Sequence, residues 1–210
     1  MTVVPSIRRA SVNDTDTVVR ILIASKKASF PDTIDDHDRD AQFWTRRWRD
    51  YILRGRLPFA LFGDGWVFLA RVAGVPVAYV AYHHTRRHGT DAELQNIYVL
   101  KEWQRKGIGA HLLGVVAHRL KADGSRSMCV GFDANSEYKQ FYMKHGAVET
   151  EPGSPWAIWH DTYALASQLP KPSEPLMTDL RGQPRWLRPR WWAMRSRAAA
   201  AERQDIRRND

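Results

Sequence analysis

The chain has 210 residues, of which 43% are hydrophobic and 26% are charged, so it can bury one substantial core and has the composition of an ordinary globular protein. No apolar run approaches the roughly 18 residues of a membrane-spanning helix, and the N-terminus lacks the apolar run of a secretory signal, so a cytoplasmic location is expected. The formal net charge is +9, but residues 167–210 hold ten Lys or Arg against five Asp or Glu, so the charge of the remaining chain gives little support for nucleic-acid binding.

The first half of the chain predicts a strand, two helices and three further strands. A strand is expected over residues 3–8, and Ser11 and Asp14 offer capping groups before an amphipathic helix that ends at the polar, turn-rich residues 30–37. A second helix, with aromatic residues at helical spacing over 43–52, ends at the Gly-Arg-Leu-Pro of residues 55–58. Strands at 66–71 and 75–82 are separated by a hairpin connection, and a third follows at 92–100.

The second half alternates between helices and strands, as an α/β domain does. Apolar residues recur at helical spacing from Ile108 to Leu120, which predicts a helix over 107–122. A strand over 126–132, a helix over 136–145 and a final strand near 157–165 follow. The single cysteine, Cys129, lies in the strand at 126–132, so no intramolecular disulfide exists and the thiol is expected to act as a small hydrophobe, not as an acyl-carrying nucleophile.

A basic turn with two glycines lies between the strand at 92–100 and the following helix. Its residues, 104–110, read Gln-Arg-Lys-Gly-Ile-Gly-Ala. Small residues allow a close turn, and the first N–H groups of the helix lack intrahelical partners, so together with the helix dipole they suit a phosphate or pyrophosphate. The turn is not a Walker A motif, and Leu112 stands where a dinucleotide fingerprint needs a third small residue. Taken alone, it is also typical of an ordinary turn with Arg105 and Lys106 as a solvated charge pair.

Two motifs resemble those of the GNAT superfamily of acyl-CoA-dependent N-acyltransferases. The first is a strand that ends in Tyr98-Val99 and is followed, after a short linker, by Gln-Arg-Lys-Gly-Ile-Gly at residues 104–109. The second, at residues 135–147, is similar to the family's Asn-x-x-Ala-x-x-Phe-Tyr-x-Lys-x-Gly-Phe element, with Tyr138 in place of Ala and Ala147 in place of Phe. The resemblance extends from about residue 4 to residue 165, and two motifs in the family's order identify the chain as a member.

This resemblance implies a fold and a donor. The fold is α/β (α+β), a GNAT domain over residues 1–166 with a mixed central sheet of about six to seven strands, about four flanking helices and a splay at the strand pair that binds coenzyme A. The donor is acetyl-CoA, the acceptor is a primary amine that attacks directly in a ternary complex, and no metal is expected.

The family pattern also assigns cofactor contacts. Backbone N–H groups of the basic turn are expected to hold the pyrophosphate, and the edge of the preceding strand is expected to pair with the pantetheine amide as an added strand would. Residues at the start of the second motif are expected to border the pantetheine or nucleotide arm. The expected cofactor-binding residues are Tyr98, Val99, Gln104, Arg105, Lys106, Gly107, Ile108, Gly109, Ala110, Asn135 and Tyr138.

Two residues are candidates for proton transfer. Glu93 stands at the start of the motif strand, where related enzymes often carry an acid, and is the candidate general base; the competing interpretation is a surface strand carboxylate. Tyr142 occupies the family position from which a phenol approaches the sulfur of coenzyme A, and is the candidate general acid; the competing interpretation is a core aromatic beside Phe141.

The acceptor site is less well specified. His83 and His84 lack the spacing of a zinc site and fall on opposite faces of a strand, so a rim position near the acceptor is favoured over metal binding. Acceptor walls are expected from Trp44, Trp48 and Tyr51 and from the 83–90 loop, although core packing explains these aromatic residues equally well.

The C-terminal residues 167–210 are predicted to be a Pro-rich linker and a basic Arg/Trp extension. Trp186, Trp191 and Trp192 lie among arginines, a pattern that suits single-stranded nucleic acid or an anionic membrane surface, or else tryptophans that cover an apolar patch on the domain or on a second subunit of a homodimer. An alternative function is therefore a non-catalytic module that senses acyl-CoA and whose tail contacts nucleic acid or a protein partner.

Overall fold

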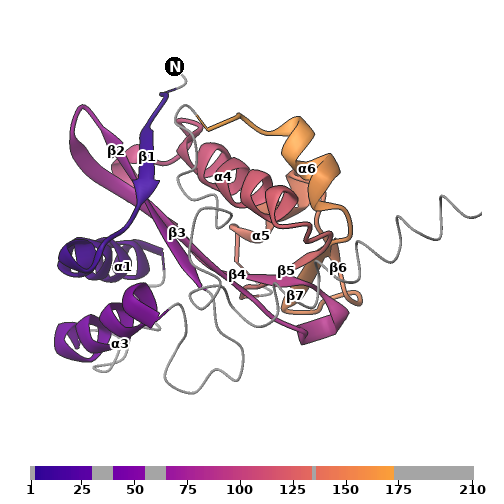
Figure 1. Ribbon diagram of the computed structural model, residues 1–210, viewed down its shortest axis with the longest axis horizontal. Helices are drawn as coiled ribbons and strands as arrows, with labels where there is room; N and C mark the ends of the chain where they lie inside the picture. The colour runs from indigo at the N-terminus through magenta and orange to yellow at the C-terminus, as the bar shows by residue number, and fades with distance from the viewer. Residues whose placement is uncertain (1–2, 30–39, 55–64, 134–135, 173–210) are drawn as a thin grey trace, which may run out of the picture. The chain divides into compact units, whose positions relative to one another are not determined.

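The computed structural model describes residues 3–29, 40–54, 65–133 and 136–172, which all lie in a compact unit spanning Met1–Leu176. Its centre is a seven-stranded sheet in the order β1-β2-β3-β4-β5-β7-β6, which confirms the predicted mixed sheet (Figure 1). Neighbouring strands are antiparallel except for the parallel pair β4 and β5. The strands are β1 (Ser6–Arg9), β2 (Trp66–Val72), β3 (Val75–His84), β4 (Ala92–Val99), β5 (Met128–Gly131), β6 (Val148–Glu149) and β7 (Trp156–Trp159).

Helices cover both faces of the sheet, with α1 and α3 on one side and α4 and α6 on the other (Figure 1). The helices are α1 (Thr15–Ser29), α3 (Ala41–Arg54), α4 (Ile108–Ala122), α5 (Lys139–Lys144) and α6 (Thr162–Gln168), and the 3-10 turns are η1 (Val12–Asp14), η2 (Arg87–Gly89) and η3 (Lys101–Trp103). The aromatic helix predicted over 43–52 is α3, and the glycine turn leads into α4, both as expected.

The sheet separates two apolar cores. On β3, Val80 and Tyr82 pack with the buried residues of α4, whereas Tyr79 and Ala81 pack with those of α1 and α3. A strand that is buried on both faces need not alternate between apolar and polar residues, and β3 is continuously apolar or aromatic up to its two terminal histidines. Trp48 and Tyr51 of α3 are almost completely buried, so the core interpretation of these aromatic residues holds.

The connection between β2 and β3 has the geometry that its sequence predicts. Ala73 and Gly74 have φ angles of 48° and 80°, and positive φ at both central residues is the signature of a two-residue hairpin of the type I′ family. This turn fixes the register in which β2 and β3 pair.

The end of the domain differs from the prediction. The strand expected over 157–165 stops at Trp159, and the chain then forms α6. The side chain of Asp161 accepts hydrogen bonds from the backbone N–H groups of Tyr163 at 2.9 Å and Ala164 at 3.1 Å, which starts a helix where the apolar pattern suggested a continued strand. This helix runs past residue 166, and Leu169 beyond it is buried.

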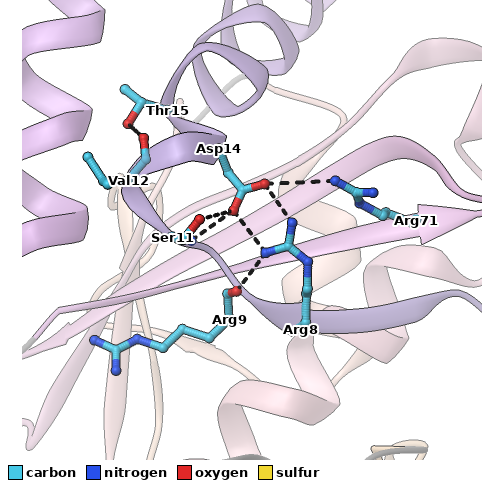
Figure 2. Close-up of polar contacts among 7 residues, drawn as sticks. All are labelled: Arg8, Arg9, Ser11, Val12, Asp14, Thr15 and Arg71. Carbon is cyan, nitrogen blue, oxygen red and sulfur yellow. Dashed lines mark hydrogen bonds and ion pairs between the residues drawn. The ribbon is translucent and has the colours of Figure 1, made fainter.

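An acidic residue ties the start of α1 to the sheet (Figure 2). Asp14 accepts two hydrogen bonds from Arg8, at 2.8 and 2.6 Å, and two from the backbone N–H and hydroxyl of Ser11, both at 2.8 Å. Arg71 of β2 lies 3.8 Å away. The predicted capping group is therefore also the ionic link between β1, β2 and the first helix.

Among the described residues, no helix combines the length and the apolar character needed to cross a membrane.

Candidate active site

The two parallel strands at the centre of the sheet separate after three residue pairs. β4 pairs with β5 only from Ala92 to Leu94, opposite Met128 to Val130, although β4 continues to Val99. Residues 95–99 therefore have no strand partner on the β5 side, and a cavity of about 630 Å³ opens there, lined by residues of both strands. The predicted splay is present.

A β-bulge lies at the point of separation. Ala81 of β3 pairs with Asn96 and Tyr82 pairs with Leu94, so Gln95 is an extra residue without a partner on β3. Gln95 lines the cavity. Because bulges bend a strand and interrupt its ladder, the bulge contributes to the change in direction of β4 where it leaves β5.

The glycine turn closes one end of the cavity. Gly107, with φ 87°, is the N-cap of α4, and Arg105 also has a positive φ of 56°. The α4 N-terminus has no side-chain cap, so its first N–H groups face the cavity end unsatisfied by a capping side chain. The side-chain amide of Gln104 donates to the carbonyl of Val99 at 3.0 Å, which holds the turn against the end of β4.

The expected cofactor-binding residues fall into three groups. Asn135 lies outside the described residues. The side chain of Ile108 is in the core, and Lys106 packs over the Trp103 ring at 4.8 Å, so neither of these two lines the cavity. The expected residues that line it are Tyr98, Val99, Gln104, Arg105, Gly107, Gly109, Ala110 and Tyr138.

Residues of α5 form another wall of the cavity. A Cβ atom on Gly109 would lie 3.3 Å from the Phe141 ring, so a glycine at this position lets α4 approach α5 closely. The hydroxyl of Tyr138 accepts a hydrogen bond from Ser29 at 2.9 Å, which joins α5 to the end of α1. Ser29, which the sequence analysis missed, also lines the cavity.

Tyr142 lies on the cavity wall and also packs against the core. Its ring stacks on Phe132 with centroids 5.6 Å apart and meets Trp159 edge-on at 6.0 Å. Burial raises the pKa of Tyr142, so its hydroxyl stays protonated and able to donate at neutral pH. The two interpretations of this residue, cavity donor and core aromatic, are both compatible with its position.

Glu93 lies on β4 directly before the lining residues and is only 6% exposed, so it is not a surface carboxylate. One carboxylate oxygen lies 3.3 Å from Nε of Arg87 and 3.7 Å from Nε2 of His83. Burial raises the pKa of Glu93, opposed by the positive charges of Arg87 and His88. Arg87 could not be singled out from the sequence, because nothing about an arginine in a polar loop indicates that it contacts a carboxylate on a strand.

The two histidines of β3 lie on opposite faces, as the strand alternation predicts, but both are buried. His83 is near Tyr51, whose hydroxyl lies 3.5 Å from Nδ1, and burial lowers the pKa of His83 to about 4, with the charge of Arg87 adding to the shift. His84 contacts the backbone oxygen of Asp91 at 3.3 Å. Both histidines are therefore buried at the end of β3 and do not occupy the expected rim position.

Burial also raises the pKa of the Cys129 thiol, which suits the hydrophobic role expected for it. No group of three or more His, Cys, Asp or Glu side chains that could hold a metal ion occurs within the described part of the chain.

This architecture matches that of a known protein family. The model of the GNAT acetyltransferase family matches residues 25–147, which include β4, the glycine turn, α4 and α5. The chain belongs to the GNAT acetyltransferase family. Membership of this family indicates acyl transfer, and the family match spans both motifs identified in the sequence.

Solved structures share the fold at low sequence identity. The PaiA N-acetyltransferase of Thermoplasma acidophilum, in complex with coenzyme A, is 18% identical with a TM-score of 0.60, over 75% of this chain and 99% of that one. A putative GNAT acetyltransferase of Desulfovibrio desulfuricans is 18% identical with a TM-score of 0.55, over 74% and 96%. A GNAT acetyltransferase of Brucella melitensis, in complex with acetyl-CoA, is 14% identical with a TM-score of 0.50, over 83% and 92%. No curated protein sequence matches the chain.

Proposed function

We propose that this protein is an N-acetyltransferase that moves the acetyl group of acetyl-CoA to a primary amine in a ternary complex. The observation that carries the proposal is the cavity between the diverging strands β4 and β5, which ends at the glycine turn before α4. A long ligand with an amide-containing arm and a phosphate end matches these two features. Structures of the same fold with bound coenzyme A and acetyl-CoA add support.

The cofactor contacts follow from this match. The unpaired edge of β4 over residues 95–99 accepts the pantetheine arm as an added strand. The pyrophosphate binds the N–H groups of residues 105–110, where Ile108 and Lys106 contribute through the main chain because their side chains point elsewhere. Gln104 acts by holding the turn to Val99. Tyr138 borders the arm, and the family motif assigns Asn135 beside it.

The chemistry needs one base and one acid. The neutral amine nitrogen attacks the thioester carbonyl carbon, and its proton passes through water to Glu93, whose buried carboxylate is a stronger base than an exposed one. The tetrahedral intermediate collapses when the carbon–sulfur bond breaks. Tyr142 donates its hydroxyl proton to the departing thiolate and is reprotonated through solvent, so the products are the acetylated amine and free coenzyme A.

The test is release of free thiol from acetyl-CoA with a panel of amines and peptides. Tyr142→Phe keeps the ring contacts with Phe132 and Trp159 but lacks the proton, so we expect kcat to fall by about 10²-fold with little change in the affinity for acetyl-CoA. Tyr163→Phe on α6, which does not line the cavity, is the control. Unchanged turnover in Tyr142→Phe would assign the residue to packing alone, and acetyl-CoA binding without turnover of any amine would favour a sensor over an enzyme.

A further inference from the structure

The loop that leads into β4 carries three consecutive basic residues beside the candidate base. Arg86, Arg87 and His88 lie in and around η2, where His88 has a positive φ of 51°. The backbone of Arg87 is held at both ends, because its N–H donates to Thr85 at 3.2 Å and its carbonyl accepts from the Thr90 hydroxyl at 2.8 Å. The loop therefore presents its basic side chains in a defined arrangement.

The guanidinium of Arg87 is positioned by contacts on two sides. Its Nε lies 3.3 Å from Glu93, and its central carbon lies 4.7 Å from the ring centroid of Trp156 on β7. The Trp156 ring lies close to β5, since a Cβ atom on Gly131 would lie 3.0 Å from this ring. The centroid of the His88 ring lies 4.9 Å from that of Trp156. Because the tryptophan ring contacts the guanidinium and the carboxylate contacts its Nε, the remaining donors have a set direction.

These remaining donors are available to a ligand. The Arg87 side chain is 51% exposed, whereas that of Glu93 is 8% exposed. Within the described ranges, the two terminal nitrogens of Arg87 make no hydrogen bond or ion pair. Arg86, in contrast, lies 3.6 Å from Asp91. The two terminal N–H groups of an arginine form the fork that binds a carboxylate with two parallel hydrogen bonds.

The charge balance of the pair constrains the acceptor. His83 is neutral at pH 7 because its pKa is lowered to about 4, so of the two basic side chains in contact with the Glu93 carboxylate, Arg87 is the charged one. A plain amine that approaches Glu93 as an ammonium ion competes with Arg87 for the same carboxylate, and weaker pairing of a half-buried guanidinium is costly. An amine that also carries an anion replaces the lost partner, so both original charges stay paired.

We infer that the acceptor is an amine with a carboxylate close to its nitrogen, as in an amino acid, and that Arg87 is the residue that recognises this carboxylate. The inference rests on the proposed function, since it assumes that the amine meets Glu93. It makes Arg87 a specificity-determining residue whose guanidinium fork contacts the acceptor directly, with Trp156 as the support that orients it.

The experiment compares amino acids with their own primary amides, which differ only in the carboxylate. Thiol release from acetyl-CoA is measured for each pair, and kcat/KM is corrected to the concentration of neutral amine because the amide has the lower amine pKa. Wild type is expected to prefer the acid over the amide by at least about tenfold for the best pair. Arg87→Met keeps a long, unbranched side chain but removes the guanidinium and its charge, and is expected to bring this ratio close to one.

Two further variants sharpen the result. Arg87→Lys retains the charge but not the fork, and is expected to give an intermediate ratio. Arg86→Met removes the neighbouring, more exposed arginine and is expected to keep the wild-type ratio. Equal rates for acid and amide in wild type, or a wild-type ratio in Arg87→Met, would overturn the inference.

A second measurement separates this inference from the proposed function. If no amine is acetylated, the proposed function fails, and the acceptor inference is then judged by calorimetric titration of the same pairs into protein saturated with coenzyme A. Binding of the amino acid but not of its amide, lost in Arg87→Met, would support Arg87 as a carboxylate site. The lack of any carboxylate-dependent binding would reject it.

Discussion

Two acidic residues, Glu93 and Asp14, are each 6% exposed, yet the pKa values of their side chains shift in opposite directions. Burial raises the pKa of Glu93, which has one arginine at 3.3 Å from a single oxygen. Asp14 has its pKa lowered, chiefly by the hydrogen bonds from Arg8 and further by those from Ser11, which outweigh the effect of burial. The larger number of hydrogen bonds to Asp14 therefore keeps it ionised as a structural anion, whereas Glu93 is suited to accept a proton.

Asp14→Asn is expected to destabilise the protein at neutral pH. The substitution removes the partner of Arg8 and one side of the capping box, which together are worth about 1–3 kcal/mol in the free energy of unfolding. The folded pKa of Asp14 is lowered, so this stability is present above the unfolded pKa and is lost as the pH falls through the folded pKa. The difference between wild type and variant in urea unfolding should therefore shrink by on the order of 1 kcal/mol between pH 7 and pH 3.

Asp16→Asn serves as the control for this experiment. Asp16 lies in the first turn of the same helix but is exposed. Its contribution is expected to stay within about 0.5 kcal/mol. A similar loss of stability in both variants would indicate a general charge effect and contradict the structural role of Asp14.

The candidate base predicts a particular pH profile. Glu93 acts as a carboxylate and its pKa is raised, so kcat/KM should fall as the pH drops through a value above that of an exposed glutamate. Glu93→Gln should remove this acid limb and lower kcat/KM by about 10²-fold at neutral pH, whereas Glu102→Gln, exposed in η3, should change neither. An acid limb that persists in Glu93→Gln would assign it to another group.

At the scale of elements, the start of α4 depends on a glycine in the left-handed region. Gly107 and Gly74 have similar φ angles, 87° and 80°, but Gly74 lies in the β2–β3 turn with no atom within 4 Å of an added Cβ. Replacement of either by Ala should cost about 1–2 kcal/mol of stability through backbone strain. Only Gly107→Ala should also weaken acetyl-CoA binding, because it distorts the turn whose N–H groups face the cavity.

Calorimetry on both glycine variants separates the two effects. Gly74→Ala is expected to keep the wild-type dissociation constant despite a lower melting temperature. Equal loss of acetyl-CoA affinity in both variants would mean that binding responds to overall stability, and the proposed phosphate site at the turn would be wrong.

Local sequence pattern predicted most of the elements, and the exceptions have specific physical causes. The hairpin at Gly74 and the helix after Gly107 were predicted correctly, because both depend on a glycine, which adopts the required positive φ without strain. The strand expected over 157–165 was wrong in its second half. An apolar run of this length suits a strand and a buried helix equally, and the cap at Asp161 favours the helix. The two-residue strand β6 is too short to give any periodicity.

The cavity was predicted only in part. Residues near the glycine turn were identified because the spacing of the two glycines is itself a pattern in the sequence. The bulge at Gln95 and the Arg87 contact with Glu93 arise from pairing between segments, which no single segment encodes. Trp156 is similar, since its place depends on Gly131 of the neighbouring strand.

At the scale of the whole domain, the sheet consists of two parts joined weakly at its centre. Strands β1 to β4 form one part and β5, β7 and β6 the other, and only three residue pairs of β4 and β5 connect them. The cavity is lined by residues of both parts. A ligand that fills the cavity should therefore connect the two parts of the sheet where backbone hydrogen bonds between β4 and β5 are missing.

This arrangement predicts where acetyl-CoA stabilises the protein. At a hundred times its dissociation constant, the ligand should raise the free energy of unfolding by about 2.7 kcal/mol. Hydrogen-exchange protection should increase most at residues 95–99 of β4, at residues 130–132 and in the first turn of α4, because their opening releases the ligand. The β2–β3 turn at Ala73 and Gly74 opens without disturbing the cavity and should show no change. Gly107→Glu places bulk and negative charge where the phosphates of the ligand are expected, so it should abolish both the gain in stability and the gain in protection. Protection confined to the β2–β3 turn would mean that the ligand binds elsewhere.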